Sequence, residues 1–151
     1  MTDIIYRGGC ACGKVRYEVK GNPQVSAVCH CRYCQLRSGS AFGTLVYFSE
    51  ENFKIISGKC NTYKFISESG YNWTNQFCKT CATTLTSRLE IKPGHVGVAG
   101  GTFDPPTFWY KPETEVFCRS KCDFVVTDVP NKFDTSPMYS PVNTGEERLG
   151  S

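Results

Sequence analysis

Near its start the chain reads Cys10-Ala11-Cys12-Gly13, and towards its middle it reads Cys78-Lys79-Thr80-Cys81. The two pairs supply four thiolates, the number that closes a tetrahedral zinc site. Gly13 can provide the tight backbone turn that a cysteine knuckle, a short loop wrapped around a metal ion, requires. One ion held by all four sulfurs would tie the N-terminal strands to the middle of the chain, so we expect this site to decide the fold. Disulfides or unconnected buried cysteines are the alternative interpretation.

A third cluster, Cys29-His30-Cys31-Arg32-Tyr33-Cys34, supplies three thiolates, one short of closure. Catalytic zinc sites typically have three protein ligands and keep one position for water or substrate. Cys31 and Cys34 are spaced to share one face of a helical turn, whose first backbone N–H groups favour thiolates. The cluster therefore predicts an open zinc site that suits an exogenous thiolate. Alternatively another residue closes the site, with His30, His95, Glu115 and a spare cysteine as candidates.

The composition is that of an ordinary globular protein. The chain has 151 residues, 40% of them hydrophobic and 21% charged, which is enough for one core. Ten cysteines make about 7% of the chain, below the roughly 8–10% typical of disulfide scaffolds. The N-terminus lacks the apolar stretch of a signal peptide, and the most apolar run, residues 42–48, is too short to span a bilayer. We therefore expect a cytoplasmic protein without membrane association, in whose reducing surroundings clustered cysteines bind metal.

The charge balance argues against a nucleic-acid partner. The formal net charge is +3, but seven thiolates and two Zn²⁺ ions would bring it to zero. Lysine and arginine are also scattered along the chain, without a basic run that could follow a phosphate backbone.

Short β-rich stretches recur along the chain, separated by turn signals such as Gly21-Asn22-Pro23. They predict stacked antiparallel sheets, with one helical turn that starts at the middle cysteine cluster and ends at Gly39. We expect a folded domain over residues 1–133 and a polar tail over 134–151, whose Met138 and Tyr139 dock locally or on a second subunit of a homodimer. The expected strands cover residues 15–19, 25–29, 43–48, 53–56, 62–66, 72–77, 83–88, 96–99, 115–118 and 124–127.

The cysteine clusters and their flanking residues resemble the glutathione-dependent formaldehyde-activating family, which also includes centromere protein V-like proteins. The resemblance covers roughly residues 6 to 133. It implies a mainly β, Mss4-like fold, also called a β-tent, of twisted antiparallel sheets with zinc knuckles. The matching motifs are GGCACGKVRY at 8–17, CHCRYC at 29–34 followed by Gly39-Ser40, FCKTC at 77–81, GTFDPP at 101–106 and FWYKP at 108–112.

The resemblance also implies two zinc ions per chain and carbon–sulfur lyase activity. The reaction would be the reversible joining of glutathione, a small thiol, with formaldehyde as the carbonyl substrate, to give S-hydroxymethylglutathione. Two alternatives remain open: an enzyme of the same fold acting on another thiol adduct or carbonyl metabolite, and a non-catalytic zinc-binding interaction module. The implied ligands are Cys10, Cys12, Cys78 and Cys81 for a structural ion, and Cys29, Cys31 and Cys34 for a catalytic ion.

The chain departs from the family pattern at several positions. Members usually carry glycine where this chain has Lys79 and Ala82, and a common histidine corresponds to Glu115. Glu115 is therefore our candidate catalytic residue for moving the proton of the hemithioacetal oxygen, with His95 or water as alternatives. Cys118 and Cys122 fall outside the pattern.

Other residues have weaker claims to function. Arg37, Ser40 and Lys111 are candidate contacts to substrate carboxylates, although arginine and lysine are commonly solvated at surfaces. The aromatic run 108–110 could wall a pocket or pack in the core. We expect His30 to point away from the metal and to orient its ligands, and Cys60 to be a small, partly buried residue.

Overall fold

The computed structural model describes residues 3–142 and Leu149 of the chain, and in this part the fold is mainly β. Eleven strands and one α-helix follow one another, with short 3₁₀ turns at Glu50–Asn52, Gly100–Thr102 and Cys118–Ser120. The elements are β1 (Ile5–Gly9), β2 (Arg16–Lys20), β3 (Val25–Cys29), α1 (Arg32–Ser38), β4 (Gly43–Ser49), β5 (Phe53–Ser57), β6 (Cys60–Ile66), β7 (Asn72–Cys78), β8 (Thr84–Leu89), β9 (His95–Ala99), β10 (Thr114–Val116) and β11 (Asn131–Lys132).

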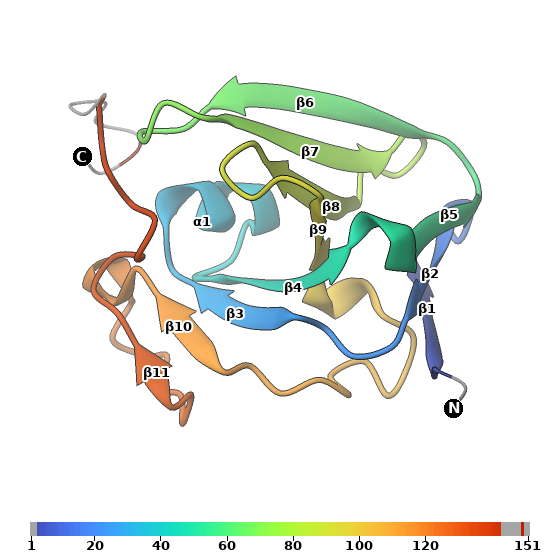
Figure 1. Ribbon diagram of the computed structural model, residues 1–151. Helices are drawn as coiled ribbons and strands as arrows, with labels where there is room; N and C mark the ends of the chain where they lie inside the picture. The colour runs from blue at the N-terminus through green and yellow to red at the C-terminus, as the bar shows by residue number, and fades with distance from the viewer. Residues whose placement is uncertain (1–2, 143–148, 150–151) are drawn as a thin grey trace.

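The strands form two sheets. A small antiparallel sheet has the order β1-β2-β5, and a large sheet has the order β11-β10-β3-β4-β9-β8-β7-β6. The large sheet curves so far that β6 and β7 pass on one side of α1 while β3 and β4 pass on the other (Figure 1). The helix therefore lies inside the curve of the sheet, and the residues at its start face several strands.

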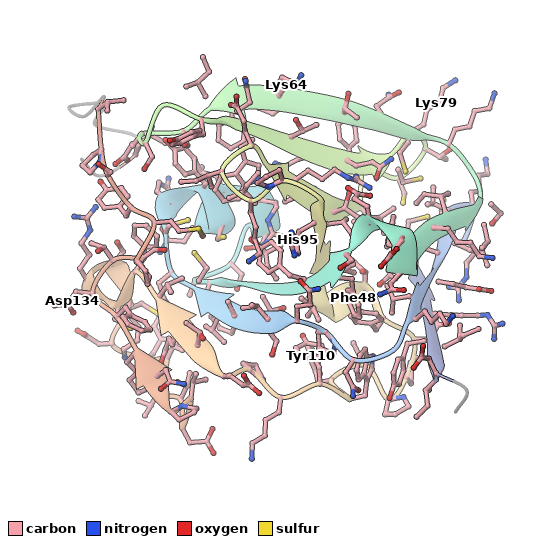
Figure 2. The ribbon with its side chains drawn as sticks, viewed as in Figure 1. Phe48, Lys64, Lys79, His95, Tyr110 and Asp134 are labelled. Atoms are coloured by element: carbon pink, nitrogen blue, oxygen red, sulfur yellow. The ribbon has the colours of Figure 1, made fainter. Side chains whose placement is uncertain are left out.

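The main core forms where the small sheet meets β4 and β9. Along β2, Tyr17 and Val19 are buried while Glu18 between them is partly exposed, which is the alternation of a strand with one face on a core. Phe103 packs edge-on against both Tyr17 and Phe48. In Figure 2 the labelled Phe48 lies within this core, whereas Lys64, on the outermost strand β6, is exposed.

The predicted mainly β, Mss4-like fold is confirmed, and all but one of the expected strands are present within a few residues of their expected bounds. The exception is residues 124–127, which form no strand because they lie beside no partner strand among the described residues. Their apolar side chains Phe124 and Val126 are accordingly 83% and 87% exposed. Two short strands, β1 and β11, were not expected. The sheets are also not wholly antiparallel, since β10 runs parallel to both β3 and β11.

Residues 133–142, which we call the C-terminal segment, return along the large sheet. The N–H of Phe117, just after β10, donates to the Thr135 carbonyl at 3.0 Å, and the N–H of Val142 donates to the Glu68 carbonyl at 2.8 Å. The segment thus runs from the end of β10 to the turn between β6 and β7 (Figure 1). Tyr139 docks within its own chain, while residues 143–148 and 150–151 of the expected tail lie outside the described part.

The domain boundary expected at residue 133 stays a prediction. None of the described helices is long and apolar enough to cross a bilayer.

Candidate metal centres and the adjoining cavity

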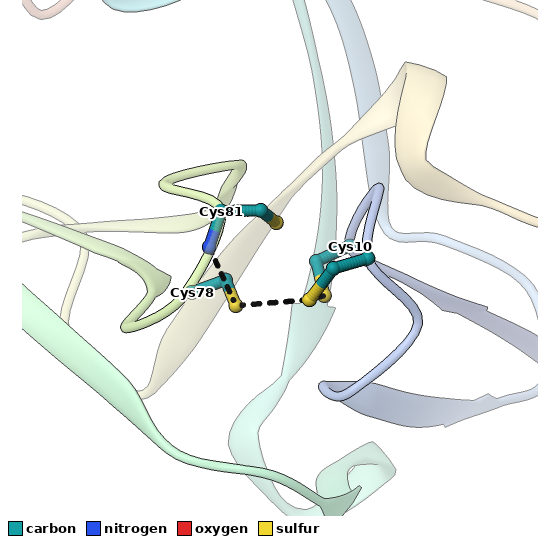
Figure 3. Close-up of side chains that lie close together, drawn as sticks. Cys10, Cys78 and Cys81 are labelled. Carbon is teal, nitrogen blue, oxygen red and sulfur yellow. Dashed lines mark hydrogen bonds between the residues drawn. The ribbon is translucent and has the colours of Figure 1, made fainter.

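The sulfur atoms of Cys10, Cys12, Cys78 and Cys81 come together, all within 4.8 Å of one another. Two of the sulfur–sulfur distances are 3.5 Å, between Cys10 and Cys12, and 3.8 Å, between Cys12 and Cys78. A tetrahedral zinc ion with Zn–S bonds of about 2.3 Å needs sulfurs about 3.8 Å apart. The four positions therefore suit one tetrahedral ion (Figure 3).

Two tight turns present these sulfurs. The first turn joins β1 to β2, with Gly13 at a φ of 78° as expected for a knuckle. The second follows β7, where the Thr80 and Cys81 N–H groups donate to the Cys78 sulfur at 3.3 and 3.4 Å. Hydrogen bonds from the Thr83 side chain and backbone lower the pKa of Cys81 to about 5. Backbone N–H groups directed at sulfur stabilise thiolates, which is the form that binds zinc.

The second cluster contains Cys29, Cys31 and Cys34, whose sulfurs also lie within 4.8 Å of one another. All three residues are buried, Cys34 completely. Among the described residues, no fourth histidine, cysteine or carboxylate atom joins this group. None of the outside residues considered from the sequence therefore closes the trio, which has three protein donors within the part of the chain that the structure describes.

The start of α1 holds this trio in place. Cys31 is the N-cap residue, and its sulfur accepts a hydrogen bond from the Cys34 N–H at 3.4 Å. Gly39 ends the helix in the left-handed conformation, as predicted. Cys29 is the last residue of β3, so a strand end and the first helical turn bring the three sulfurs together.

Arg37 is the cation of this site. The pKa of Cys34 is well below its ordinary value. Hydrogen bonds from the Cys29 and Cys31 thiols lower it most, and the positive charge of the Arg37 guanidinium lowers it further. The Nε and Nη2 atoms of Arg37 are buried and have no hydrogen-bond partner among the described residues. Gly43 on β4 makes room for this guanidinium, because a Cβ there would collide with Arg37 Nη2. Three thiolates around a divalent ion carry one net negative charge, so a single buried cation fits the donor set.

Glu115 lies on the other face of the large sheet. Its neighbours on β10, Thr114 and Val116, line the same cavity as Cys29 and Cys31, whereas Glu115 points away from that cavity and is fully buried. This position follows from the alternation of side chains along a strand. The carboxylate of Glu115 therefore cannot reach a substrate bound at the trio without rearrangement of the sheet.

Glu115 instead anchors His30, the residue between two of the cysteines. The His30 Nε2 and Glu115 Oε1 atoms are 2.7 Å apart, and both side chains are fully buried. Thr127 donates to the other carboxylate oxygen at 2.6 Å, and Lys132 forms an ion pair with it. Burial raises the pKa of Glu115, but the hydrogen bonds from Lys132, Thr127 and His30 outweigh it and lower the pKa to about 2. A fixed carboxylate thus holds the Cys29–Cys31 loop through its histidine.

A cavity of about 400 Å³ opens beside the trio, and we call it the cysteine cavity. Cys29 and Cys31 form part of its lining, so two of the three sulfur-bearing residues border open space. Most of the remaining lining is aromatic or aliphatic. Its main apolar side chains are Tyr33, Leu45, Tyr47, Trp73, Leu89 and Phe117.

The other predicted site residues lie elsewhere. Ser40 and Lys111 are exposed and do not border the cysteine cavity, and Trp109 stacks on Tyr6 beside the main core. His95 sits at the start of β9, hydrogen-bonded to the Pro93 carbonyl and to Gln24. The walls of the cysteine cavity are formed by different aromatic residues, which sequence reasoning missed.

The ten cysteines all lie in the described part, and all are free thiols. Cys60 on β6 lies opposite Cys78 on β7 in the strand register, without a disulfide between them. It packs against the main core, as expected for a small partly buried residue. Cys118 borders a second cavity, on the Glu115 side of the sheet, and belongs to neither sulfur cluster.

A family model described as glutathione-dependent formaldehyde-activating enzyme matches residues 5–120. The chain belongs to this family. The match includes both sulfur clusters and ends before the C-terminal segment, which therefore lies beyond the part that this chain shares with the family model.

The chain is also similar to solved structures, one of which comes from Rhodobacter sphaeroides. A crystal structure of a Rhodobacter sphaeroides protein superposes with a TM-score of 0.53 and 20% sequence identity, over 70% of this chain and 97% of that one. At this level of identity the likeness concerns the fold alone.

Proposed function

We propose that this member of the glutathione-dependent formaldehyde-activating family is a zinc-dependent carbon–sulfur lyase acting on a glutathione–carbonyl adduct, with S-hydroxymethylglutathione synthase-like chemistry. One zinc ion would be enclosed by Cys10, Cys12, Cys78 and Cys81, and a second would be held by Cys29, Cys31 and Cys34. The observation that carries the proposal is the buried trio of sulfurs, which lacks a fourth donor among the described residues and borders a cavity.

The residues of the trio have separate tasks. Cys29, Cys31 and Cys34 supply the donors, while Arg37 balances their remaining negative charge from the buried side. Bound by these three thiolates, zinc would supply a Lewis acid that keeps an incoming thiol deprotonated near neutral pH and stabilises a departing thiolate. Glu115 acts through His30, fixing the loop between Cys29 and Cys31, so we assign it a positioning role.

Proton transfer to the hemithioacetal oxygen needs a group inside the cysteine cavity. Glu115 and His95 do not border that cavity, so water is the remaining candidate of the three considered.

The proposal includes a cytoplasmic location, because the thiols of both clusters must stay reduced. Homodimer formation stays a prediction.

Exchange NMR with zinc-loaded protein, glutathione and formaldehyde tests the proposal. We expect the wild type to accelerate exchange between free glutathione and its adduct, and Cys34→Ala to reduce the rate to background. Cys118→Ala is the matched control, since that cysteine lies outside both clusters, and it should exchange at the wild-type rate. If the wild type does not exceed the spontaneous rate, the substrate assignment fails.

A further inference from the structure

We infer that the carbonyl partner of this enzyme is an aldehyde bearing an apolar group of several carbons, and that the C-terminal segment forms one wall of the subsite that holds this group. The inference rests on the proposed function, since it assigns a substrate class to the same cavity. Its basis is the mismatch between the lining of the cysteine cavity and a one-carbon substrate.

Formaldehyde contributes almost no surface that an apolar wall could bind. The cysteine cavity has a volume of about 400 Å³, and Leu45, Trp73, Leu89 and Val116 are among its walls. The polar backbone and charged groups of a glutathione-like thiol would lose hydration against such side chains without gaining hydrogen bonds. An alkyl or aryl group on the aldehyde is the part of an adduct that these walls suit.

The same lining also contains charged residues. Arg32, Lys92 and Arg119 contribute positive charge, while Glu68 is the only carboxylate among the described lining residues. Two of these cations are held over aromatic rings, with Lys92 5.2 Å from the Tyr47 ring centre and Arg119 5.0 Å from that of Tyr139. The net positive charge suits the carboxylates of the thiol partner, which leaves the apolar walls for the carbonyl partner.

The C-terminal segment completes the apolar wall. Met138 and Tyr139 border the cysteine cavity, and the Tyr139 hydroxyl donates to the Glu68 carboxylate at 2.6 Å while it accepts from Arg119 at 3.1 Å. The Tyr139 ring packs edge-on against Phe117 with centres 5.2 Å apart. Glu68 is nearly buried, so its hydrogen bond fixes the position of the tyrosine.

The backbone of Phe117 gives a second, independent indication, because it is held in a strained conformation beside this wall. Its φ is 57°, a left-handed conformation that is a true outlier for a bulky residue. The conformation is held by the Phe117 N–H, which donates to Thr135 of the C-terminal segment, and by its carbonyl, which accepts from Ser120 at 3.0 Å. Strain that the surroundings hold in place beside a cavity points to a functional role for the ring.

The reaction itself balances with these two partners alone. The thiol gives its proton to water, its sulfur forms a bond to the aldehyde carbon, and the π electrons of the carbonyl move to oxygen. Water then passes the same proton to that oxygen to give the hemithioacetal, so water is regenerated. The reverse step breaks the same carbon–sulfur bond and returns thiol and aldehyde, with neither oxidant nor reductant.

Two measurements on the zinc-loaded full chain test the inference. The first is calorimetric binding of S-hexylglutathione and S-methylglutathione, which differ only in the length of the apolar group. We expect the hexyl compound to bind at least about tenfold more tightly, because the extra methylenes leave water. The second is exchange NMR with glutathione and either pentanal or formaldehyde, in which the enzyme should favour pentanal by a similar factor.

Variants of the C-terminal segment link the preference to its wall. Tyr139→Ala and Met138→Ala should each reduce the hexyl-to-methyl affinity ratio several-fold. Met138→Ala should leave the affinity for S-methylglutathione close to that of the wild type, whereas Tyr139→Ala, which also releases Arg119, should weaken the binding of both compounds. Phe124→Ala is the matched control, because it removes an exposed aromatic ring that does not border the cysteine cavity. It should leave the ratio unchanged.

The outcomes separate the two proposals. Equal affinities for the two S-alkyl compounds, or a preference that Tyr139→Ala leaves intact, would overturn the assignment of the apolar subsite even if formaldehyde is exchanged. Preferential hexyl binding without exchange of either aldehyde would overturn the proposed lyase function and leave the binding specificity standing.

Discussion

The two sulfur clusters are made of the same residue type, yet they connect different parts of the molecule. The four-cysteine cluster joins positions 66 residues apart, since Cys12 meets Cys78, and it links the small sheet to the end of β7. The three-cysteine cluster comes from one six-residue stretch, so its sulfurs close no long loop. An ion in the first cluster would therefore stabilise the fold, whereas one in the second contributes little to chain topology.

The clusters also differ in their surroundings. Cys12 is exposed and its cluster borders neither of the two described cavities, while the trio is buried beside the cysteine cavity and beside Arg37. A closed set of donors needs no further partner. A set of three with a balancing cation and adjacent space is arranged to accept a ligand. The comparison thus supports the proposal that one cluster serves folding and the other serves chemistry.

Removing one cysteine from each cluster tests this division most strongly. Cys78→Ala should lose most of a metal-linked folding contribution on the order of 10 kcal/mol and accumulate as insoluble or unfolded protein. Cys34→Ala should keep the circular dichroism of the wild type, contain one zinc ion fewer and show only background exchange. Zinc analysis, circular dichroism and exchange NMR on both proteins provide the measurement, and a similar loss of folding in the two variants would contradict the division.

The two cysteine clusters could be predicted from the sequence, because neighbouring cysteines of each motif lie only two or three positions apart along the chain. The trio lies within residues 29–34, and the helical turn that gathers it follows from Cys31 as N-cap and Gly39 as C-cap. The pairing of the two knuckles, although long-range, needed only the count of four thiolates. The fold class followed from the alternating stretches and from the family motifs.

The cavity walls and the orientation of Glu115 could not be predicted in the same way. Trp73, Phe117 and Tyr139 come from three distant segments, and only the curvature of the large sheet brings them together. Glu115 points away from the trio because of its register on β10, and a shift of one residue would have reversed its side. The strand expected at residues 124–127 was wrong because strand formation also depends on a partner strand, which the alternation of apolar residues does not reveal.

The anchoring of His30 gives a prediction that depends on pH. The pKa of Glu115 is lowered from 4.5 to about 2, so its ionised form stabilises the fold above pH 4.5, and this contribution disappears as the pH falls towards 2. Glu115→Gln should lower the free energy of unfolding at pH 7 by about 2 kcal/mol, a value reduced for the solvent exposure of Lys132. Denaturant unfolding at steps between pH 7 and pH 3 should show the gap between wild type and variant narrowing below pH 4.5.

A surface carboxylate provides the control for this experiment. Glu18 pairs with Arg7 and Lys54, both largely exposed, so Glu18→Gln should change stability by less than about 1 kcal/mol. If Glu115→Gln and Glu18→Gln were equally stable at pH 7, the buried contact between Glu115 and His30 would stabilise the fold no more than a surface ion pair does.

The cation beside the trio can be displaced without replacing a cysteine. A methyl group at Gly43 would collide with Arg37 Nη2 and lie 3.2 Å from Cys34 Cβ, so Gly43→Ala should move the guanidinium away from the sulfurs. We expect about a tenfold lower exchange rate, since one charge-assisted contact is weakened. Gly101→Ala is the control, because a Cβ there meets no atom within 4 Å, and it should keep the wild-type rate.

The smallest effect concerns the second knuckle of the four-cysteine cluster. The resemblance to the family leads us to expect glycine at the positions of Lys79 and Ala82, but of these two residues only Ala82 has a positive φ, 63°. Ala82→Gly should therefore raise the free energy of unfolding by about 0.5–1 kcal/mol by relieving this strain, whereas Lys79→Gly should lower it by a similar amount through a more flexible unfolded chain. Both variants should keep wild-type exchange activity, because the proposed role of the affected cluster is to stabilise the fold. Thermal unfolding of the zinc-loaded proteins would measure the two shifts, and shifts of the same sign would show that backbone strain at Ala82 does not limit the stability of the knuckle.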